Sequence, residues 1–300
     1  MLRKVFDRAS HIIWRIVRQL EILKVSSKFF GYLMPTNEIN KFKLRKKCPL
    51  GNKGEEIFLL RDTIISPFVN KKGYWERETS DSIINYVNEL TDNHRIMFID
   101  IGSNQGLITR QVLLGIKKSK ISDLQVLCVE PHPKFMDLAK LNLSFNNNIK
   151  YINGALSYSN EINSNILYFN LKNSTATLES ASSYYEKLER IEVELIHWNE
   201  LVSNLFFDRI IIKCDTDGSD LDILVMISET LDWKNVIYFE LEINVKSKIS
   251  DNSFARLKEI IDKTNRIIFK TKKYETSNKS SVINEFRNKD QINGTLVLIK

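Results

Sequence analysis

The sequence predicts an α/β domain in which a mostly parallel sheet lies between two layers of helices. Strand-like and helix-like segments alternate along most of its 300 residues, which is the pattern of repeated strand–helix–strand units. Some strand-like segments are unbroken apolar runs, such as Ile210 to Ile212, and such runs indicate burial on both faces of a sheet. A glycine-rich turn at residues 102–106, after another of these runs, is typical of a ligand site at the edge of the sheet.

The predicted elements begin with two short strands and one helix, at residues 57–60, 64–65 and 80–90. Alternating strands and helices follow, at 96–101, 106–117, 125–129, 134–146 and 149–152. Three short segments of antiparallel character come next, at 166–170, 175–179 and 190–196. The alternation then resumes at 208–214, 219–231, 235–242, 252–264 and 266–271, and a last strand covers 294–299. The last two strands have no clear helix between them, so an antiparallel strand is expected at the C-terminal edge of the sheet.

A basic amphipathic helix is predicted at the N-terminal end. Apolar side chains recur at three- and four-residue steps from Leu2 to Leu23, with arginines and lysines between them. A loop rich in Asn and Lys follows Pro35, so we divide the chain into a helix and linker, residues 1–53, and a ligand-binding domain, residues 54–300. Three partners stay open for the helix: its own domain or a dimer mate, an anionic membrane surface, or a partner protein.

The net charge of +7 comes mainly from this N-terminal segment, so nucleic acid is not expected as a partner of the domain. The three cysteines lack the spacing of a metal site, and Cys128 and Cys214 lie in apolar runs, which predicts buried thiols in a reducing compartment. No apolar stretch reaches the roughly eighteen residues of a membrane span, and the start of the chain lacks the pattern of a secretory signal. We therefore expect a cytoplasmic protein that the basic helix can hold at the inner face of the membrane.

The glycine-rich turn is the most informative motif, and it reads Asp100-Ile101-Gly102-Ser103-Asn104-Gln105-Gly106. A pyrophosphate site needs three glycines in the pattern G-x-G-x-x-G, whereas here an acid precedes the first of two glycines. A carboxylate would repel a pyrophosphate but suits a ligand with an amino group and a sulfonium cation, such as S-adenosylmethionine. Asp100 is expected to accept a hydrogen bond from the ligand's amino group. Gly102 and Gly106 are expected to let the backbone approach the ligand closely.

Glu130 is the second expected ligand contact. It follows a strand-like run one strand–helix unit after the glycines, where an acid can bind two ribose hydroxyls. Pro131 and Pro133 stiffen the loop after it. His132, between the two prolines, is expected to shape this loop or the ligand's edge rather than to act as a base.

A lysine and two carboxylates, Lys213, Asp215 and Asp217, come at the end of the strand expected at 208–214. This places them at the same edge of the sheet as the two acids described above. An acid here can orient or deprotonate an acceptor hydroxyl, or bind a divalent cation that does so. Asp217 has a second interpretation, as the cap of the helix expected at 219–231. Two more acids end the next strand and can close the acceptor pocket: Glu240 and Glu242.

Four motifs in this order resemble the FkbM-type S-adenosylmethionine-dependent methyltransferases. They are the turn at 100–106, Val129-Glu130-Pro131-His132-Pro133, Asn153-Gly154-Ala155-Leu156-Ser157 and Ile212-Lys213-Cys214-Asp215-Thr216-Asp217-Gly218. The resemblance also includes Gly73-Tyr74-Trp75-Glu76 and Phe239-Glu240, and it covers roughly residues 55–300. The last of the four motifs departs from the family's usual pattern, because Cys214 replaces an aliphatic residue and Asp217 stands where Glu is typical.

The resemblance implies a Rossmann-like class I methyltransferase fold and transfer of a methyl group from S-adenosylmethionine to a hydroxyl. The acceptor it implies is a sugar of a bacterial glycan or glycolipid, and hence a role in polysaccharide modification. Two other functions stay open: a catalytically silent cofactor-binding scaffold module of a glycan-assembly complex, and a methyltransferase of a non-glycan natural product. The missing third glycine of the phosphate loop argues against an NAD-dependent oxidoreductase.

The resemblance also implies roles for individual residues. The expected cofactor-binding residues are Asp100, Gly102, Ser103, Asn104, Gly106, Glu130, Pro131, Ala155 and Leu156. Ala155 and Leu156 are expected at the adenine edge. The expected catalytic residues are Asp215, Lys213, Asp217 and Glu240. Asp215 serves as the base or orients the acceptor, while Lys213 holds Asp215 or binds an acidic substrate. A divalent cation is compatible with these residues but is not indicated.

Overall fold

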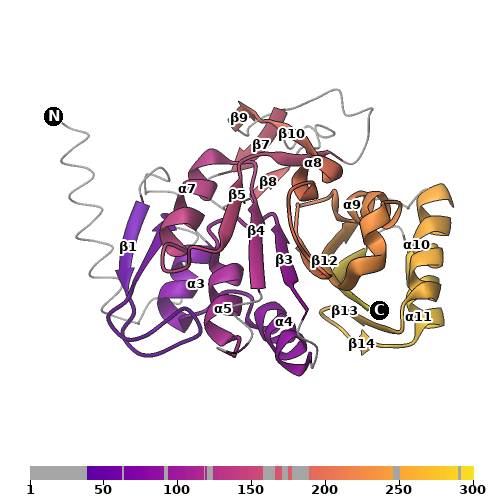
Figure 1. Cartoon of the computed structure of the whole chain (residues 1–300), viewed down its shortest axis with the longest axis horizontal. Coiled ribbons are helices and arrows are strands. Elements are labelled where there is room, and N and C mark those ends of the chain that lie inside the picture. Colours follow the sequence, from indigo (N-terminus) through magenta and orange to yellow (C-terminus); the bar gives the residue numbers. More distant parts are fainter. Residues whose placement is uncertain are drawn as a thin grey trace.

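The computed structural model describes most of the chain from Ile39 onward (Figure 1). The described residues are 39–62, 64–90, 94–117, 119, 124–157, 166–170, 175–177, 189–245, 251–289 and 292–300. The amphipathic helix expected from Leu2 to Leu23 lies outside the described residues, so its existence and its partner stay predictions. No helix in the described part of the chain is both long and apolar enough to cross a membrane.

A sheet of eight strands, in the order β14-β13-β15-β12-β11-β3-β4-β5, forms the centre of the domain. Its strands are β3 (Ile96–Ile101), β4 (Leu124–Val129), β5 (Ile149–Ile152), β11 (Arg209–Cys214), β12 (Val236–Val245), β13 (Arg266–Lys270), β14 (Glu275–Thr276) and β15 (Ile292–Ile299). From β12 to β5 the neighbouring strands are parallel, whereas β15 runs antiparallel to both β12 and β13. The predicted fold class, a mostly parallel sheet with antiparallel strands toward one edge, is confirmed.

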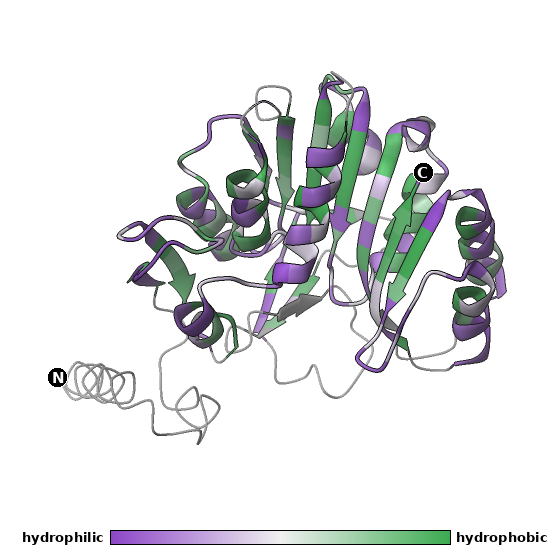
Figure 2. Cartoon of the chain, turned by 90° about the horizontal axis from the view of Figure 1, so that it is seen from below, coloured by the Kyte–Doolittle hydropathy of each residue, from purple (hydrophilic) through white to green (hydrophobic). Residues whose placement is uncertain are grey.

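Helices cover both faces of this sheet and complete the three predicted layers (Figure 1). One face carries α4 (Arg77–Glu89), α5 (Leu107–Gly115) and α7 (Pro133–Asn142), and the other carries α8 (Trp198–Val202), α9 (Asp220–Ser228), α10 (Asp251–Lys263) and α11 (Lys279–Asn288). Successive residues of a strand point to opposite faces, so Phe98 packs under the first group and Ile99 under the second. Figure 2 shows apolar strands between helices that carry hydrophilic residues.

Three smaller sheets surround the central one. β1 (Ile39–Lys43) pairs antiparallel with β2 (Glu56–Leu60). β7 (Ile166–Asn170) pairs antiparallel with β8 (Thr175–Thr177) and β9 (Glu189–Glu192), which confirms the antiparallel character expected for this region. The segment expected at 190–196 is divided, because β10 (Leu195–His197) leaves β9 and pairs in parallel with β6 (Ala155–Ser157). The helix expected at 219–231 is likewise divided into α9 and the short 3₁₀ helix η2 (Leu231–Asn235).

The short strand expected at 64–65 is wrong, because α3 (Ile65–Lys72) begins there. The Asp62 carboxylate accepts hydrogen bonds from the backbone N–H groups of Ile64 and Ser66, at 3.0 and 2.9 Å. These bonds satisfy N–H groups that a helix start leaves without intrahelical partners. The apolar Ile64-Ile65 pair therefore opens a helix, although the pair alone has the composition of a strand.

Two further differences concern the ends of the domain. The loop expected up to residue 53 contains β1, and Phe42 and Leu50 are buried with Ile57 in one apolar cluster. The division of the chain at residues 53 and 54 stays a prediction. Near the C-terminus, α11 lies between the last two long strands, and β15 lies inside the edge, between β12 and β13. Only Val282 and Phe286 of α11 are buried, which explains why its apolar pattern is weak.

Candidate active site

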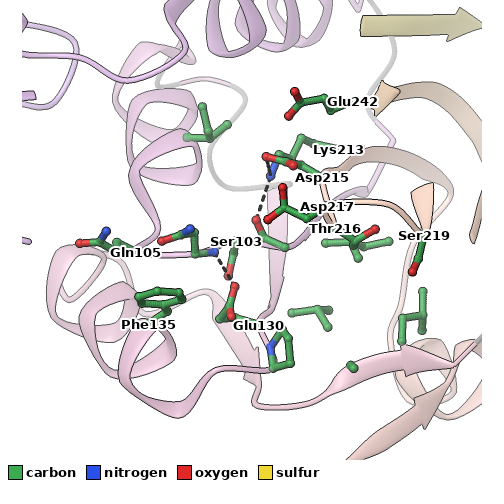
Figure 3. Close-up of a pocket in the computed structure, with 18 of the residues that line it drawn as sticks. Ser103, Gln105, Glu130, Phe135, Lys213, Asp215, Thr216, Asp217, Ser219 and Glu242 are labelled. Carbon is green, nitrogen blue, oxygen red and sulfur yellow. Dashed lines mark hydrogen bonds and ion pairs between the residues drawn. The ribbon is translucent and has the colours of Figure 1, made fainter. Parts of the chain in front are cut away.

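The carboxyl ends of β3, β4 and β11 meet at a cavity of about 240 Å³, which we call the first cavity. This is the position at which α/β sheets bind ligands. Figure 3 shows Glu130 and Phe135 on one side of it and Lys213, Asp215 and Glu242 on the other. Of the predicted site residues, those that line it are Gly102, Ser103, Asn104, Glu130, Pro131, Ala155, Leu156, Lys213, Asp215 and Asp217.

The two glycines of the turn are required by close contacts within the chain. Both have a φ of 73°, which favours glycine. A Cβ on Gly102 would lie 1.8 Å from the carbonyl oxygen of Asp215, so only glycine lets the two loops approach. A Cβ on Gly106 would lie 3.1 Å from the Cα of Ala139 in α7. We expected close approach of a ligand at both positions. The structure shows close approach of a neighbouring loop and a neighbouring helix, and the expected approach of a ligand stays a prediction.

Asp100 lies beneath the turn and does not line the first cavity. Its Oδ2 accepts a hydrogen bond from the Thr109 hydroxyl at 2.6 Å, and its Oδ1 lies 3.2 Å from Lys213 Nζ. The same ammonium donates a 2.9 Å hydrogen bond to the carbonyl oxygen of Gly102. In this arrangement Asp100 supports the turn, and its expected contact with the ligand's amino group stays a prediction.

Lys213 is buried and its charge is already neutralised. Burial lowers the pKa of its ammonium, but the attraction of Asp100, Asp215 and Glu76 outweighs burial and raises the pKa above the ordinary value. Asp215 Oδ2 lies 3.6 Å from Lys213 Nζ, as expected if the lysine holds this carboxylate. The other expected role, binding an acidic substrate, does not fit an ammonium that is 4% exposed and has two carboxylates beside it.

Glu130 lies at the tip of β4, where its side chain lines the first cavity. Its two carboxylate oxygens accept hydrogen bonds from the backbone N–H groups of Asn104 and His132, both at 2.8 Å. Burial raises the pKa of Glu130 to about 7, although these two bonds lower it. The carboxyl is thus fixed between the glycine turn and the β4–α7 loop.

His132 shapes the β4–α7 loop, which is one of the two roles expected for it. Its Nδ1 accepts a hydrogen bond from the backbone N–H of Lys134 at 3.2 Å and so caps α7. Its ring lies 4.5 Å from the ring centres of Phe135 and Phe169. Burial lowers the pKa of His132 to about 4, so it is neutral at pH 7.

The loop after β11 brings Asp217 to the first cavity in a left-handed backbone conformation, with a φ of 54°. The alternative interpretation of Asp217 as the helix cap is wrong. The backbone N–H groups of Thr216 and Gly218 bond instead to the carboxylate of Asp220, at 2.9 and 3.3 Å. Asp220, which the sequence did not single out, therefore holds this loop.

A second cavity of about 820 Å³ adjoins the first. The two share Ile64, Trp75, Glu76, Lys213, Asp215 and Glu242. Glu240 lines the second cavity, and it accepts a 2.5 Å hydrogen bond from the Tyr238 hydroxyl. Burial raises the pKa of Glu240 to about 7. Glu240 and Glu242 thus both line the second cavity, and their expected place at an acceptor pocket stays a prediction.

Glu76 belongs to this junction but was not among the predicted site residues. It has a φ of 39°, precedes α4 and lines both cavities. Burial and the nearby Asp215 raise its pKa to about 7. Burial and Asp215 also raise the pKa of Glu242, to about 8. The sequence signal for Glu76 is its place in the Gly73–Glu76 motif, which lies outside the strand ends.

The first cavity fits S-adenosylmethionine in its chemistry. Glu130 at the strand tip suits ribose hydroxyls, and Ala155, Leu156 and Phe135 provide an apolar end for adenine. The buried Thr216 hydroxyl has no hydrogen-bond partner among the described residues, as expected of a group that awaits a ligand. No group of three or more His, Cys, Asp or Glu residues in the described ranges is arranged to hold a metal ion.

Comparisons with solved structures give distant similarities, and no curated protein matches. The precorrin-6y C5,15-methyltransferase from Geobacter metallireducens GS-15 is 12% identical with a TM-score of 0.34, over 74% of this chain and 86% of that one. The human methyltransferase 10 domain containing protein is 13% identical with a TM-score of 0.36, over 74% and 81%. The cofactor-bound Rv0187 from MTB is 11% identical with a TM-score of 0.38, over 75% and 80%.

A family model gives the decisive match. The model of the methyltransferase FkbM domain matches residues 100–266 of the 300, more than half of the chain. The matched segment runs from the glycine turn through Glu130 to the loop that carries Asp215, and so contains most of the residues that line the first cavity. The chain is an S-adenosylmethionine-dependent methyltransferase, and it belongs to the FkbM methyltransferase family.

Proposed function

We propose that this enzyme transfers the methyl group of S-adenosylmethionine to a hydroxyl of a sugar in a bacterial glycan or glycolipid. The observation that carries the proposal is the junction of the two cavities. The first has the residues for the cofactor, the second has room for an acceptor, and Asp215 lies in the wall that they share. The acceptor hydroxyl and the cofactor's methyl group can thus meet beside a carboxylate.

The residues of the first cavity divide between the parts of the cofactor. In our proposal Glu130 binds the ribose hydroxyls and Ala155 with Leu156 contacts the adenine edge. The backbone from Gly102 to Asn104 lies at the methionine end. When bound, S-adenosylmethionine supplies a methyl group on a sulfonium, which is a good leaving group.

The second cavity has the features of a site for a neutral, hydroxylated acceptor. Phe68, Tyr74 and Trp75 form an aromatic wall, with ring centres 5.6 and 5.5 Å from Phe68 to the other two. Aromatic faces pack against the apolar faces of sugar rings, and carboxylates such as Glu240 accept hydrogen bonds from hydroxyls. An acidic acceptor would meet several carboxylates here and would be repelled.

Asp215 is our candidate for the group that receives the hydroxyl proton. Its side chain is 27% exposed and lies beside the buried ammonium of Lys213, whose charge stabilises the carboxylate. Lys213 remains protonated and cannot take the proton itself. Glu242 lies near Asp215, whose negative charge raises the pKa of Glu242. Such a base contributes about 10²–10⁴-fold in rate, and the rest of the acceleration comes from orientation of the acceptor.

A single set of measurements tests this function. Glycans from cells with and without the protein are compared by mass spectrometry, and the proposal requires an increase of one methyl group that appears only with the protein. With the acceptor so identified, Asp215→Asn is expected to lower kcat by about 10²–10⁴-fold while the affinity for S-adenosylmethionine stays unchanged. Full turnover in this variant would refute Asp215 as the base. Glu229→Gln, an exposed acid that pairs with Arg256, serves as the control.

The alternatives give different results in the same experiment. A catalytically silent scaffold module would bind S-adenosylmethionine without methylating any acceptor. A methyltransferase of a non-glycan natural product would leave the glycans unchanged and methylate a small molecule.

For the N-terminal helix we propose association with an anionic membrane or a protein partner, at the cytoplasmic face. Liposome flotation of the chain with and without residues 1–30 separates these two. Membrane association makes the full chain float with the liposomes and the shortened chain not, whereas association with a protein partner gives no flotation of either chain.

A further inference from the structure

Asp100, the acid that the sequence assigns to the cofactor's amino group, already has a partner for each of its two oxygens. Asp100 has no exposed surface, and its two oxygens face the Thr109 hydroxyl and the Lys213 ammonium. An ammonium group in the first cavity would therefore have to displace Lys213 to reach Asp100. Displacement would leave the lysine buried without its partner, which is costly. Another carboxylate is needed at the methionine end of the cavity.

Glu76 is a carboxylate in the right place and without an ion-pair partner at contact distance in the described part of the chain. It lines the first cavity together with Gly102 and Ser103 of the turn. Within the described ranges, no basic side chain lies within ion-pair distance of it. Its backbone is held in the left-handed region at the start of α4, so its side chain leaves the helix at a fixed point. The site thus holds a carboxylate with no ion-pair partner among the described residues, although the more distant Lys213 lowers its pKa.

The other acids of the first cavity have partners. Both oxygens of Glu130 accept backbone N–H groups at the far strand tip. Asp215 lies beside Lys213, 3.6 Å from its ammonium nitrogen. A ligand cation at this end would gain most from Glu76, because a carboxylate without an ion-pair partner is free to bind a positive charge.

We propose that Glu76 binds the ammonium group of the methionine part of S-adenosylmethionine and thereby positions the cofactor. The proposal rests on the cofactor part of the proposed function and is independent of the acceptor. It also accounts for the strained backbone at Glu76, since strain of this kind persists at ligand sites where the surroundings enforce it. A bound ammonium would lower the pKa of Glu76 from its raised value of about 7, because a nearby positive charge favours the ionised carboxylate.

Isothermal titration of the full chain with three probes at pH 8 tests the proposal. S-adenosylhomocysteine carries both the ammonium and the carboxylate, decarboxylated S-adenosylhomocysteine keeps only the ammonium, and 5′-methylthioadenosine has neither. Glu76→Gln is expected to lower the affinity for the first two probes by about tenfold to hundredfold. The affinity for the third probe is expected to stay within about twofold of that of the parent protein. Unchanged binding of 5′-methylthioadenosine also shows that the variant is folded.

Glu78→Gln is the matched control, because Glu78 lies in the same first turn of α4, pairs with Lys270 and does not line the first cavity. Its affinities for all three probes are expected to equal those of the parent. Equal weakening of all three probes by Glu76→Gln would overturn the proposal, as would unchanged affinities. Weakening confined to S-adenosylhomocysteine would assign Glu76 to the carboxylate end and overturn it too. If the parent protein bound none of the probes, the cofactor assignment itself would fall.

Discussion

Replacing Lys213 with methionine tests the buried ion pair beneath the glycine turn. Lys213 is 4% exposed and Asp100 is fully buried, with 3.2 Å between the ammonium nitrogen and Oδ1. The ammonium also donates to the carbonyl oxygen of Gly102. Methionine matches the length of lysine but has no charge and no donor, so Asp100 is left buried without a cation.

The expected cost follows from this burial. Removal of one partner of a buried ion pair costs about 3–5 kcal/mol, because the remaining charge is uncompensated. Replacement of both partners removes both buried charges of this pair and leaves only Asp215, whose side chain is 27% exposed, without its cation. The double variant Lys213→Met/Asp100→Asn is therefore expected within about 2 kcal/mol of the parent, although each single change is destabilising. The pair then stabilises the protein little relative to a neutral replacement, and its main effect is to position the turn.

Urea unfolding of the parent, both single variants and the double variant measures these free energies. Lys258→Met is the control, since Lys258 pairs with Asp262 at 3.2 Å but the two side chains are 53% and 50% exposed. Such a surface pair contributes at most about 1 kcal/mol. The reasoning is refuted if Lys213→Met costs no more than this control. It is also refuted if the double variant is as unstable as the sum of the single variants.

Two further predictions concern stability. Gly102→Ala should cost about 1–2 kcal/mol for its positive φ plus about 1–3 kcal/mol for the contact with the Asp215 carbonyl. At Gly54 φ is 92° and no atom lies within 4 Å of an added Cβ, so Gly54→Ala should cost only about 1–2 kcal/mol, for the positive φ. Equal urea midpoints for the Gly102→Ala and Gly54→Ala variants would contradict this. Because the folded pKa of Glu130, about 7, lies above its ordinary value of 4.5, the folded state binds the proton more tightly. Its stabilising contribution is complete below pH 4.5 and is lost as the pH rises through 7, about 3 kcal/mol in all. Glu130→Gln should flatten the pH dependence of the unfolding free energy between these limits. An unchanged slope would show that the raised pKa of Glu130 is not its cause.

Local patterns in the sequence were enough for the sheet and most of its helices. Unbroken apolar runs such as residues 96–101 need burial on both faces, and this requirement alone indicates a central strand. The same patterns placed Glu130 and Asp215 at the edge of the sheet, because the carboxyl ends of parallel strands meet there. The patterns failed where few residues carry the signal, as in α11, or where a side chain such as Asp62 starts a helix inside an apolar segment.

The sequence by itself determined the family, the fold and the strand ends that carry the site. Tertiary structure alone decided which charges in that site are neutralised. Asp100 and Lys213 are 113 positions apart, and only the parallel pairing of β3 with β11 places them side by side. That pairing binds Asp100 to Lys213, whereas Glu76, at the start of α4, has no ion-pair partner among the described residues. The electrostatics of a buried group depend on neighbours that folding brings together, so the order of residues along the chain does not reveal them.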